Sequence, residues 1–423
     1  MYQKMTEDLI EFIRKGKSTY HVTTEMRNLL ESSGVELLEE TESWHLERGK
    51  KYMIERDGSA LIAFSVPRTR PQAVRIAAAH TDSPAFKVKW NPEVGVEDKY
   101  IKLNVEKYGG GILSSWFDRP LSLAGRVSVM ESEEIRTVLV DIDRDLLVIP
   151  NLAIHMNRRI NDGYGYNVQN DLLPMFGNYE AKDSFMNLIA EASGVCCENI
   201  LGMDLTLYNR MIGTYTGVNG EFILSPRLDD LQCLYAGIRG FIESDSDSSM
   251  GFFCAFDSEE IGSTGTQGAS STFLTDIAER IRCVLGMSEE EFYVVAARGF
   301  FLSADNAHAI HPNAVEKADL TNRPVLNGGI VIKYSADGSY VTNGVTGAKV
   351  KALCKRVGIP YQEFYNRSDM RGGSTLGQLS LAKWSIPAAD IGLAQLAMHS
   401  SCETGGTKDT YYMYQLMKTF FHT

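Results

Sequence analysis

"CAFDSEEI" at residues 254–261 is an apolar run of the kind found in buried strands, and it stops at two adjacent acids, Glu259 and Glu260. A pair of glutamates at a strand end most often marks only a solvated turn. A second short apolar run, "AVRIAAAH" at residues 73–80, stops in the same way at His80. In open α/β sheets, ligands bind outside the carboxyl ends of the strands. The glutamate pair therefore gains meaning if the rest of the chain builds such a sheet.

The patterns along both ends of the chain predict this kind of sheet. Two helices are expected near the N-terminus, at residues 5–15 and 20–33, followed by a hairpin turn at Asp57-Gly58. The elements expected after residue 221 are strands near 250–257, 299–305, 329–335 and 387–392, and helices near 229–243, 270–284, 346–357, 375–384 and at the C-terminus. The alternation predicts an α/β fold with a mostly parallel central sheet flanked by helices.

The segment 87–220 has a different texture, with Val, Lys, Tyr and Gly alternating in short runs and few helical stretches. It is predicted to be mostly β. A length of 423 residues also favours two domains over one. We therefore expect an α/β domain formed by residues 1–86 and 221–423, interrupted by a β-rich domain at 87–220.

Composition excludes several classes of partner. The net charge is -12, which argues against a nucleic acid or an anionic membrane as the ligand. No stretch approaches the ~18 apolar residues of a membrane span, and the N-terminus lacks the apolar core of a signal peptide. The 7 cysteines are an odd number without CxxC spacing, which favours reduced thiols. A cytoplasmic globular protein is expected.

Polar residues of the types that bind metals or transfer protons follow several expected strands. These residues are His80 with Asp82, Asp229 with Asp230, Glu259 with Glu260, Asp305, and His399. Each is weak evidence alone, because a single histidine is more often structural and a single aspartate often caps a turn. His308 and His311 also have ligand-like spacing, but they lie in an expected loop beside Pro312 and are assigned a structural role.

Taken together, these residues indicate a specific type of site. One imidazole and one carboxylate at each of two positions, plus one shared carboxylate, can bind a pair of divalent metal ions with open coordination positions. Zinc accepts both donor types. The two adjacent glutamates then have separate roles. One binds a metal ion, while its neighbour acts as general base on the water that the metal ion activates.

Eight motifs carry a resemblance to a known family. In order from about residue 75 to 400 they read HTDSP, YGGGILSSWFDRPLSLAGRV, NLAIHMNRRIND, SPRLDDL, DSEEIGS, SADNAHAIHPN, GSTLG and QLAMHS. Together they resemble the aspartyl aminopeptidase family of co-catalytic zinc metallopeptidases. The number of motifs in register makes this resemblance far more specific than any single one of them.

The resemblance implies a role for each strand-end residue. The implied ligands are His80 and Asp305 for one metal ion, Glu260 and His399 for the other, and Asp229 as the bridge between them. Zinc is the implied metal, with cobalt or manganese as alternatives. Glu259 becomes the general base, and Asp82 orients the His80 imidazole. A cis peptide bond between Asp229 and Asp230 is implied as well.

The resemblance also implies an assembly. The β-rich segment becomes a dimerisation domain, and His155 in "LAIHMNRR" reaches into the partner's active site. Dimers are expected to assemble further into tetrahedral dodecamers. Without the resemblance, His155 would be interpreted as a core histidine on a strand.

Substrate preference is expected to depend on Lys333, which ends the apolar run "GGIVIK". The family's acidic-substrate members carry a lysine at the matching place and a tyrosine matching Tyr340, so the resemblance implies that both bind an acidic side chain. On sequence alone, the lysine could simply extend to solvent. Arg371 and Asn306 depart from the family pattern and could alter the preference.

The predicted function is that of a cytoplasmic di-metal aminopeptidase that removes N-terminal Asp or Glu from peptides. One alternative is an N-acyl amino acid deacylase or carboxypeptidase on a related di-metal fold, which would need an arginine for a substrate carboxylate. A second is an aminopeptidase that prefers neutral or basic N-terminal residues. A third is a non-catalytic assembly or cargo protein, but such a relic should have lost ligands, and all are present here.

Overall fold

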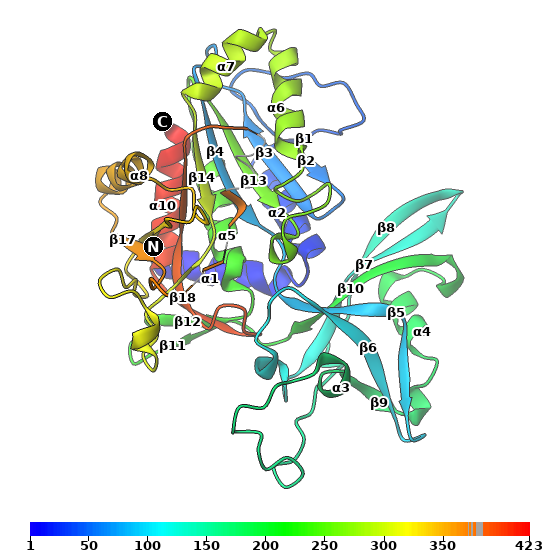
Figure 1. The fold of residues 1–423 in the computed structure, drawn as a ribbon. Coiled ribbons are helices and arrows are strands. Elements are labelled where there is room, and N and C mark those ends of the chain that lie inside the picture. Colours follow the sequence, from blue (N-terminus) through cyan, green and yellow to red (C-terminus); the bar gives the residue numbers. More distant parts are fainter. Residues whose placement is uncertain (371, 374, 378–383) are drawn as a thin grey trace.

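The computed structural model describes residues 1–423 apart from 371, 374 and 378–383. An α/β layer forms one part of the molecule, and a second, antiparallel sheet projects beside it (Figure 1). Both ends of the chain belong to the α/β layer, since helices from the N-terminal and C-terminal ends pack together there.

The centre of the large sheet consists of four neighbouring parallel strands. In spatial order they are β13 (Ser249–Phe256), β4 (Ala73–His80), β14 (Phe300–Ala304) and β18 (Ala388–Leu396). Apolar clusters cover both faces of these strands. Strands covered on both faces read as continuous apolar runs, which explains why the sequence here shows no alternation.

Shorter strands extend the large sheet on both sides of this centre. Beyond β13 lie β3 (Ala60–Ser65), β2 (Lys51–Arg56) and β1 (Glu36–Leu37). Around and beyond β18 lie β15 (Ala307–His308), β16 (Ile330–Tyr334), β17 (Tyr361–Tyr365), β19 (Glu403–Gly406), β12 (Phe222–Ser225) and β11 (Thr214–Thr216).

Helices pack on the two faces of this sheet. One face carries α1 (Tyr2–Lys15), α2 (Thr19–Ser32), α5 (Leu228–Ile242), α8 (Gly344–Val357) and α10 (Asp409–His422). The other carries α6 (Phe273–Val284) and α7 (Glu289–Ala297). The short 3-10 turns are η1 (Leu113–Trp116), η2 (Tyr179–Ala181), η3 (Cys197–Asn199), η4 (Glu259–Ile261) and η5 (Val315–Lys317).

The second sheet has its own apolar core. Its antiparallel strands, in spatial order, are β8 (Glu134–Asp141), β7 (Leu121–Glu131), β10 (Ile200–Asn209), β5 (Ala85–Val96), β6 (Tyr100–Tyr108) and β9 (Met175–Asn178). Helices α3 (Val168–Asp171) and α4 (Phe185–Ser193) accompany it. Phe185 and Ile189 of α4 are buried in this core.

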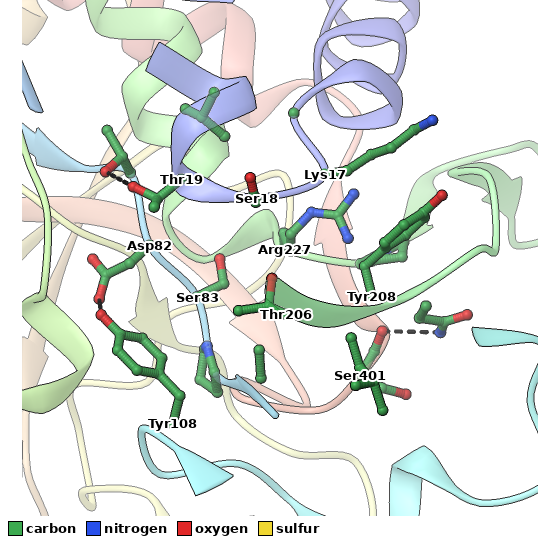
Figure 2. Close-up of a pocket in the computed structure, with 18 of the residues that line it drawn as sticks. Lys17, Ser18, Thr19, Asp82, Ser83, Tyr108, Thr206, Tyr208, Arg227 and Ser401 are labelled. Carbon is green, nitrogen blue, oxygen red and sulfur yellow. Dashed lines mark hydrogen bonds between the residues drawn. The ribbon is translucent and has the colours of Figure 1, made fainter. Parts of the chain in front are cut away.

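The two sheets are joined at a cavity lined by the turn between α1 and α2, by β10 and by the residues that follow β4 (Figure 2). Lys17 in that turn forms an ion pair with Asp141 of β8 and another, at 3.1 Å, with Asp143. Arg227 and Tyr208 lie nearby in the same view. The turn between the first two helices therefore ties the α/β layer to the second sheet.

The predicted α/β fold class is confirmed, with some elements missed. The helix expected near 375–384 falls largely outside the described residues. Helix α7 was not predicted, although Ser288 and Glu291 form a capping box that the sequence displays. Strands β11, β15, β17 and β19 are short and lie outside the four-stranded centre, where the apolar pattern is weak. No helix in the described ranges has both the length and the apolar character to cross a bilayer.

Candidate metal centre

The four central strands of the large sheet deliver most of the candidate residues. His80 is the last residue of β4, and Asp305 directly follows β14. Glu259 and Glu260 lie in η4, which follows β13, and His399 lies shortly after β18. Because these strands are parallel neighbours, their carboxyl ends meet at one edge of the sheet. Residues far apart in sequence therefore gather there.

Asp229, in the first turn of α5, lies between the two histidines. Its Oδ1 is 3.6 Å from Nε2 of His80, and its Oδ2 is 3.4 Å from Nε2 of His399. Two groups of possible ligands share Asp229, each with its ligand atoms within 4.8 Å of one another: His80, Asp229 and Asp305, and Asp229, Glu260 and His399. The geometry is that of two adjacent ion positions with one carboxylate in common.

Both imidazoles present the same nitrogen to the carboxylates. The Nδ1 of His80 lies 3.1 Å from the carbonyl oxygen of Asp82, and the Nδ1 of His399 lies 3.2 Å from that of Gly110. A carbonyl oxygen only accepts hydrogen bonds, so in the neutral ring Nδ1 carries the hydrogen and Nε2 keeps a free lone pair. Histidines that bind metals are commonly oriented in this way.

The cluster fits divalent metal ions by its donor types and by its unsatisfied oxygens. Among the described residues, Asp229 Oδ1 and Glu260 Oε1 are buried without a hydrogen-bond partner. Such oxygens are costly unless a cation or a proton compensates them. The pKa of His399 is raised to about 10, because Asp229 and Glu260 outweigh the effect of its burial. The excess of negative charge thus favours bound cations, and imidazole with carboxylate suits zinc.

The turn that carries the paired glutamates is held by Asp82. The backbone N–H groups of Glu259 and Glu260 donate to the two oxygens of Asp82, each at 3.1 Å. Glu259 belongs to neither of the two groups that share Asp229, yet its carboxylate lies within 4.8 Å of the ligand atoms of His80 and Glu260. Burial raises the pKa of Glu259 to about 7. A carboxylate with that pKa can take up and release a proton near neutral pH.

Asp229 and Asp230 are joined by a cis peptide bond, which confirms the expectation from the resemblance. The Asp230 side chain is buried, and its Oδ2 accepts a hydrogen bond from the backbone N–H of His80 at 3.3 Å. The two neighbouring aspartates thus contact the same histidine from different sides.

The second sheet contributes two supporting groups that the sequence analysis missed. The hydroxyl of Tyr108 donates a 2.7 Å hydrogen bond to Asp82, visible in Figure 2. The carbonyl of Gly110 faces His399, as described above. A Cβ on Gly109 would lie only 3.1 Å from the Cβ of Glu260. The run of glycines at 109–111 was therefore a usable signal of a close backbone approach.

Glu403 is a third supporting group that was missed. It is buried, and its carboxylate accepts hydrogen bonds from the backbone N–H of Asp229 at 3.0 Å and of His399 at 2.7 Å. One side chain thus joins the backbones of a residue from α5 and a residue that follows β18. Glu403 belongs to none of the motifs, so no pattern in the sequence indicated it.

Lys333 and Tyr340 line the same pocket as His80 and Glu259. Lys333 is only 2% exposed, so it does not extend to solvent. Its Nζ lies 3.7 Å from Asp305 and 5.5 Å from the centre of the Tyr340 ring. Burial acts to lower the pKa of Lys333, but Asp305 and Tyr340 hold it above its usual value. The pocket therefore contains a charged ammonium beside the candidate ligands.

Of the two departures from the family pattern, Arg371 lies outside the described residues. Asn306 lines the pocket, but its amide is directed into the protein, where it donates to the Leu228 carbonyl at 3.0 Å and to Gln395 at 2.8 Å. Asn306 thus links α5 to β18 beneath the ligands.

His155 is exposed in a turn at residues 154–156, within the long segment between β8 and α3. It is therefore not a core histidine on a strand. It is absent from the clusters of possible ligands found in the described part of the chain. The structure of a single chain therefore does not indicate a function for His155.

Comparisons with known proteins agree with this geometry. A family model described as aminopeptidase I zinc metalloprotease (M18) matches residues 12–421. A probable M18 family aminopeptidase 2 of Clostridium novyi (strain NT) is 42% identical over 428 residues, which cover 99% of this chain and 99% of that protein.

Two solved structures are similar over nearly the whole chain. A cryo-electron-microscopy structure of the Ape4 and Nbr1 complex contains a chain with a TM-score of 0.96 and 33% identity, and the match covers 100% of this chain and 86% of that one. A structure of the S. cerevisiae mApe1 dodecamer matches with a TM-score of 0.87 and 26% identity, covering 99% of this chain and 97% of that one.

Proposed function

This chain belongs to the M18 family of zinc metallopeptidases and is an aminopeptidase, and from that premise we propose that it uses two divalent metal ions to remove acidic N-terminal residues from peptides. His80 and Asp305 would hold one ion and Glu260 and His399 the other, with Asp229 shared. Zinc is the proposed metal. The observation that carries the proposal is the sharing of Asp229 by two groups of ligand atoms.

When bound, the two ions supply Lewis-acid activation of the scissile carbonyl and of the attacking water. Glu259 takes the proton from that water and passes it to the leaving amine. Its pKa of about 7 allows both steps near neutral pH. Asp82 holds Glu259 and Glu260 at fixed positions through their backbone N–H groups. The base and the ligand are adjacent in sequence because they serve the same water.

The proposed preference for Asp or Glu rests on Lys333. Its ammonium is buried, and it lies in the same pocket as Glu259 and beside Tyr340. A substrate carboxylate that reaches it would be desolvated but paired, whereas an apolar side chain would add no partner to the ion pair that Lys333 forms with Asp305. An acidic side chain is therefore the better occupant of that end of the pocket.

We further propose that the active form is a homo-oligomer in the cytoplasm. The S. cerevisiae relative was solved as a dodecamer. A tetrahedral dodecamer of dimers would place His155 of one chain near the candidate metal centre of another. An imidazole there could donate a hydrogen bond to the developing oxyanion.

Two measurements test the proposed activity. Metal analysis of the purified protein should find up to two divalent ions per chain, and chelation should abolish hydrolysis while the far-ultraviolet circular dichroism stays native. The enzyme should hydrolyse Glu-Ala-Ala but not its N-acetylated form, because an aminopeptidase recognises the free amine. Faster hydrolysis of the acetylated peptide would support the deacylase alternative and refute the proposal.

A further inference from the structure

A second cavity opens beside the catalytic pocket. The catalytic pocket has a volume of about 250 Å³, and the neighbouring cavity has about 320 Å³. His308 and Gly373 line both of them. Among the described residues, the lining of the second cavity includes none of the candidate metal ligands. It is therefore separate from the metal centre and directly adjacent to it.

Three segments build the walls of this cavity. One follows β15, the next follows β17, and the last is the end of β18. Hydrogen bonds join the first segment to β17 and to the segment after it, from the backbone N–H of Val325 to Gln362 of β17 and from Arg367 to the Glu316 carbonyl. The volume lies within the ~300–1,000 Å³ typical of small-molecule sites. The cavity is thus a formed space large enough for a ligand.

The direction of a bound peptide follows from which side of the catalytic pocket is closed. Lys333 is almost fully buried, so under the proposed function the N-terminal side chain would end there. The rest of the peptide must then leave the pocket by another side. At His308 and Gly373 the catalytic pocket meets the second cavity. This cavity is thus the adjacent space for the residues beyond the scissile bond.

The charges of the cavity favour an anion. Its charged lining residues are Lys317, Arg367 and Asp319. Arg367 already pairs with Asp369 at 2.7 Å. Asp319 accepts backbone N–H groups from Thr321 and Asn322, and the Asn322 N–H in particular holds the pKa of Asp319 below its usual range.

Lys317 is the cation that remains. Within the described ranges no carboxylate lies at ion-pair distance from its Nζ, and its side chain is exposed. The Asp319 carboxylate is occupied by the N–H groups just named. An incoming carboxylate would therefore meet an ammonium that has no ion-pair partner among the residues that the structure describes.

We propose that the cavity binds the leaving part of a short peptide and that Lys317 pairs with a carboxylate on it. The carboxylate is either the C-terminus of the peptide or an acidic side chain on the second residue beyond the scissile bond. This inference rests on the proposed aminopeptidase function, and it adds a second position at which substrates are selected. His308, at the boundary of the two spaces, packs against the Phe364 ring with centroids 6.1 Å apart and forms part of the passage.

The test compares three peptides that share an N-terminal residue, the one that the wild type prefers. With glutamate they are Glu-Ala-Ala, Glu-Ala-Ala-amide and Glu-Ala-Glu-amide, and Glu-p-nitroanilide serves as a substrate without any carboxylate on the leaving group. For the wild type, kcat/KM should be roughly three- to tenfold higher for a peptide whose leaving part carries a carboxylate than for Glu-Ala-Ala-amide, as expected for a partly exposed ion pair.

The variants isolate Lys317. Lys317→Met should abolish the difference between acid and amide, Lys317→Arg should retain most of it, and both should hydrolyse Glu-p-nitroanilide at the wild-type rate. Lys355→Met, on the exposed side of α8, is the matched control and should behave as wild type.

Each outcome decides the matter. If kcat/KM is higher than for Glu-Ala-Ala-amide with Glu-Ala-Ala alone, Lys317 pairs with the C-terminus of the peptide. If it is higher with Glu-Ala-Glu-amide alone, Lys317 pairs with an acidic side chain. If it is higher with both, Lys317 accepts a carboxylate from either source. Equal kcat/KM for all three peptides, or a difference that survives Lys317→Met, overturns the inference. Failure to cleave any aminoacyl p-nitroanilide would instead refute the aminopeptidase itself, so the two failures are distinct.

Discussion

The candidate metal centre and the loop that carries His155 differ in whether the residues of one chain are enough to form a site. At the candidate metal centre, strand ends converge and every candidate ligand lies near others. His155 instead lies in an exposed turn, flanked by exposed Leu152, Ile154 and Met156. Exposed apolar clusters of this kind commonly mark interfaces. A chemical role can therefore be proposed for the converging residues from one chain alone, whereas a role for His155 can be proposed only together with a partner chain.

The largest expected effect on activity is that of a substitution at Glu259, which lies at the candidate metal centre. Glu259→Gln should lower kcat by ~10²- to 10⁴-fold, because the general base is lost, while the metal content stays that of the wild type. Steady-state kinetics and metal analysis measure the two quantities. Glu290→Gln, on the exposed side of α7, is the control. Full activity in Glu259→Gln would remove this residue from the mechanism.

The next largest effect is expected at His155, and it tests whether the loop that carries this residue acts on a partner chain. His155→Ala should lower kcat by ~10²- to 10³-fold if its imidazole stabilises the oxyanion. Mixing this inactive chain with the inactive Glu259→Gln chain should restore activity, because a hybrid dimer has one site with both residues intact. With random exchange, about a quarter of all sites would be intact in a twofold dimer. No recovery after verified subunit exchange would mean that His155 does not act across the interface.

A smaller change is expected for substrate choice. Lys333→Ala should reduce the ratio of kcat/KM for Glu and Leu p-nitroanilides by ~10- to 100-fold, since the acidic substrate loses its buried partner. The ratio is unaffected by a partial loss of folded enzyme, which makes it the right measurement for a buried position. Lys355→Ala is the control. If the wild type already prefers Leu or Lys, the acidic preference fails and the di-metal proposal remains.

The parts of the fold and of the candidate site that could be predicted from sequence are those marked by a clear apolar run or motif. His80, the paired glutamates and Asp305 follow apolar runs that form the central strands, so their convergence could be predicted from the rule for parallel strands. The resemblance implied that Asp229 bridges the two ions, and in the structure Asp229 belongs to two groups of possible ligands, while its role as a bridge stays a prediction. The α/β fold class was predicted on the same strand patterns and is confirmed.

The missed parts depend on contacts that leave no periodic signal. Glu403 holds Asp229 and His399 through their backbones, and its own strand β19 has only four residues. Tyr108 reaches Asp82 from the second sheet. Neither contact could be predicted, because each depends on how separate elements pack. For His155, the alternative of a core histidine on a strand is wrong, because the residue lies in an exposed turn, while its role in a partner's active site stays a prediction.

The smallest expected effect concerns the junction between the two regions. His21 lies there, with its Nδ1 2.8 Å from Ser18 Oγ, and burial lowers its pKa to about 4. As the pH falls, His21 therefore takes up a proton at a higher pH in the unfolded chain than in the folded chain. The folded state keeps the His21 ring neutral, and the stabilisation that results is fully present above about pH 6.5. It is lost as the pH falls from about 6.5 to about 4.

His21→Gln should remove this pH dependence, at most about 1–3 kcal/mol of the free energy of unfolding. Urea denaturation at pH 7.5 and pH 5.0 measures it, and comparison with wild type cancels the titration of the other histidines. His45→Gln, at an exposed position, is the control. If the difference in stability between the two pH values is the same in His21→Gln as in wild type, the junction is not sensitive to acid through this residue.

The order of the candidate ligands along the chain has a consequence for biosynthesis. His80 leaves the ribosome early, whereas His399, Glu403 and helix α10, which packs against α1 and α5, follow only after more than three hundred further residues. Translation is slow compared with the formation of local structure, so the early segments wait for most of the synthesis time without their last strand. If His399 is one of the ligands, as proposed, a nascent chain cannot form the second ion position before translation has passed residue 399, and we expect no peptidase activity from it until then.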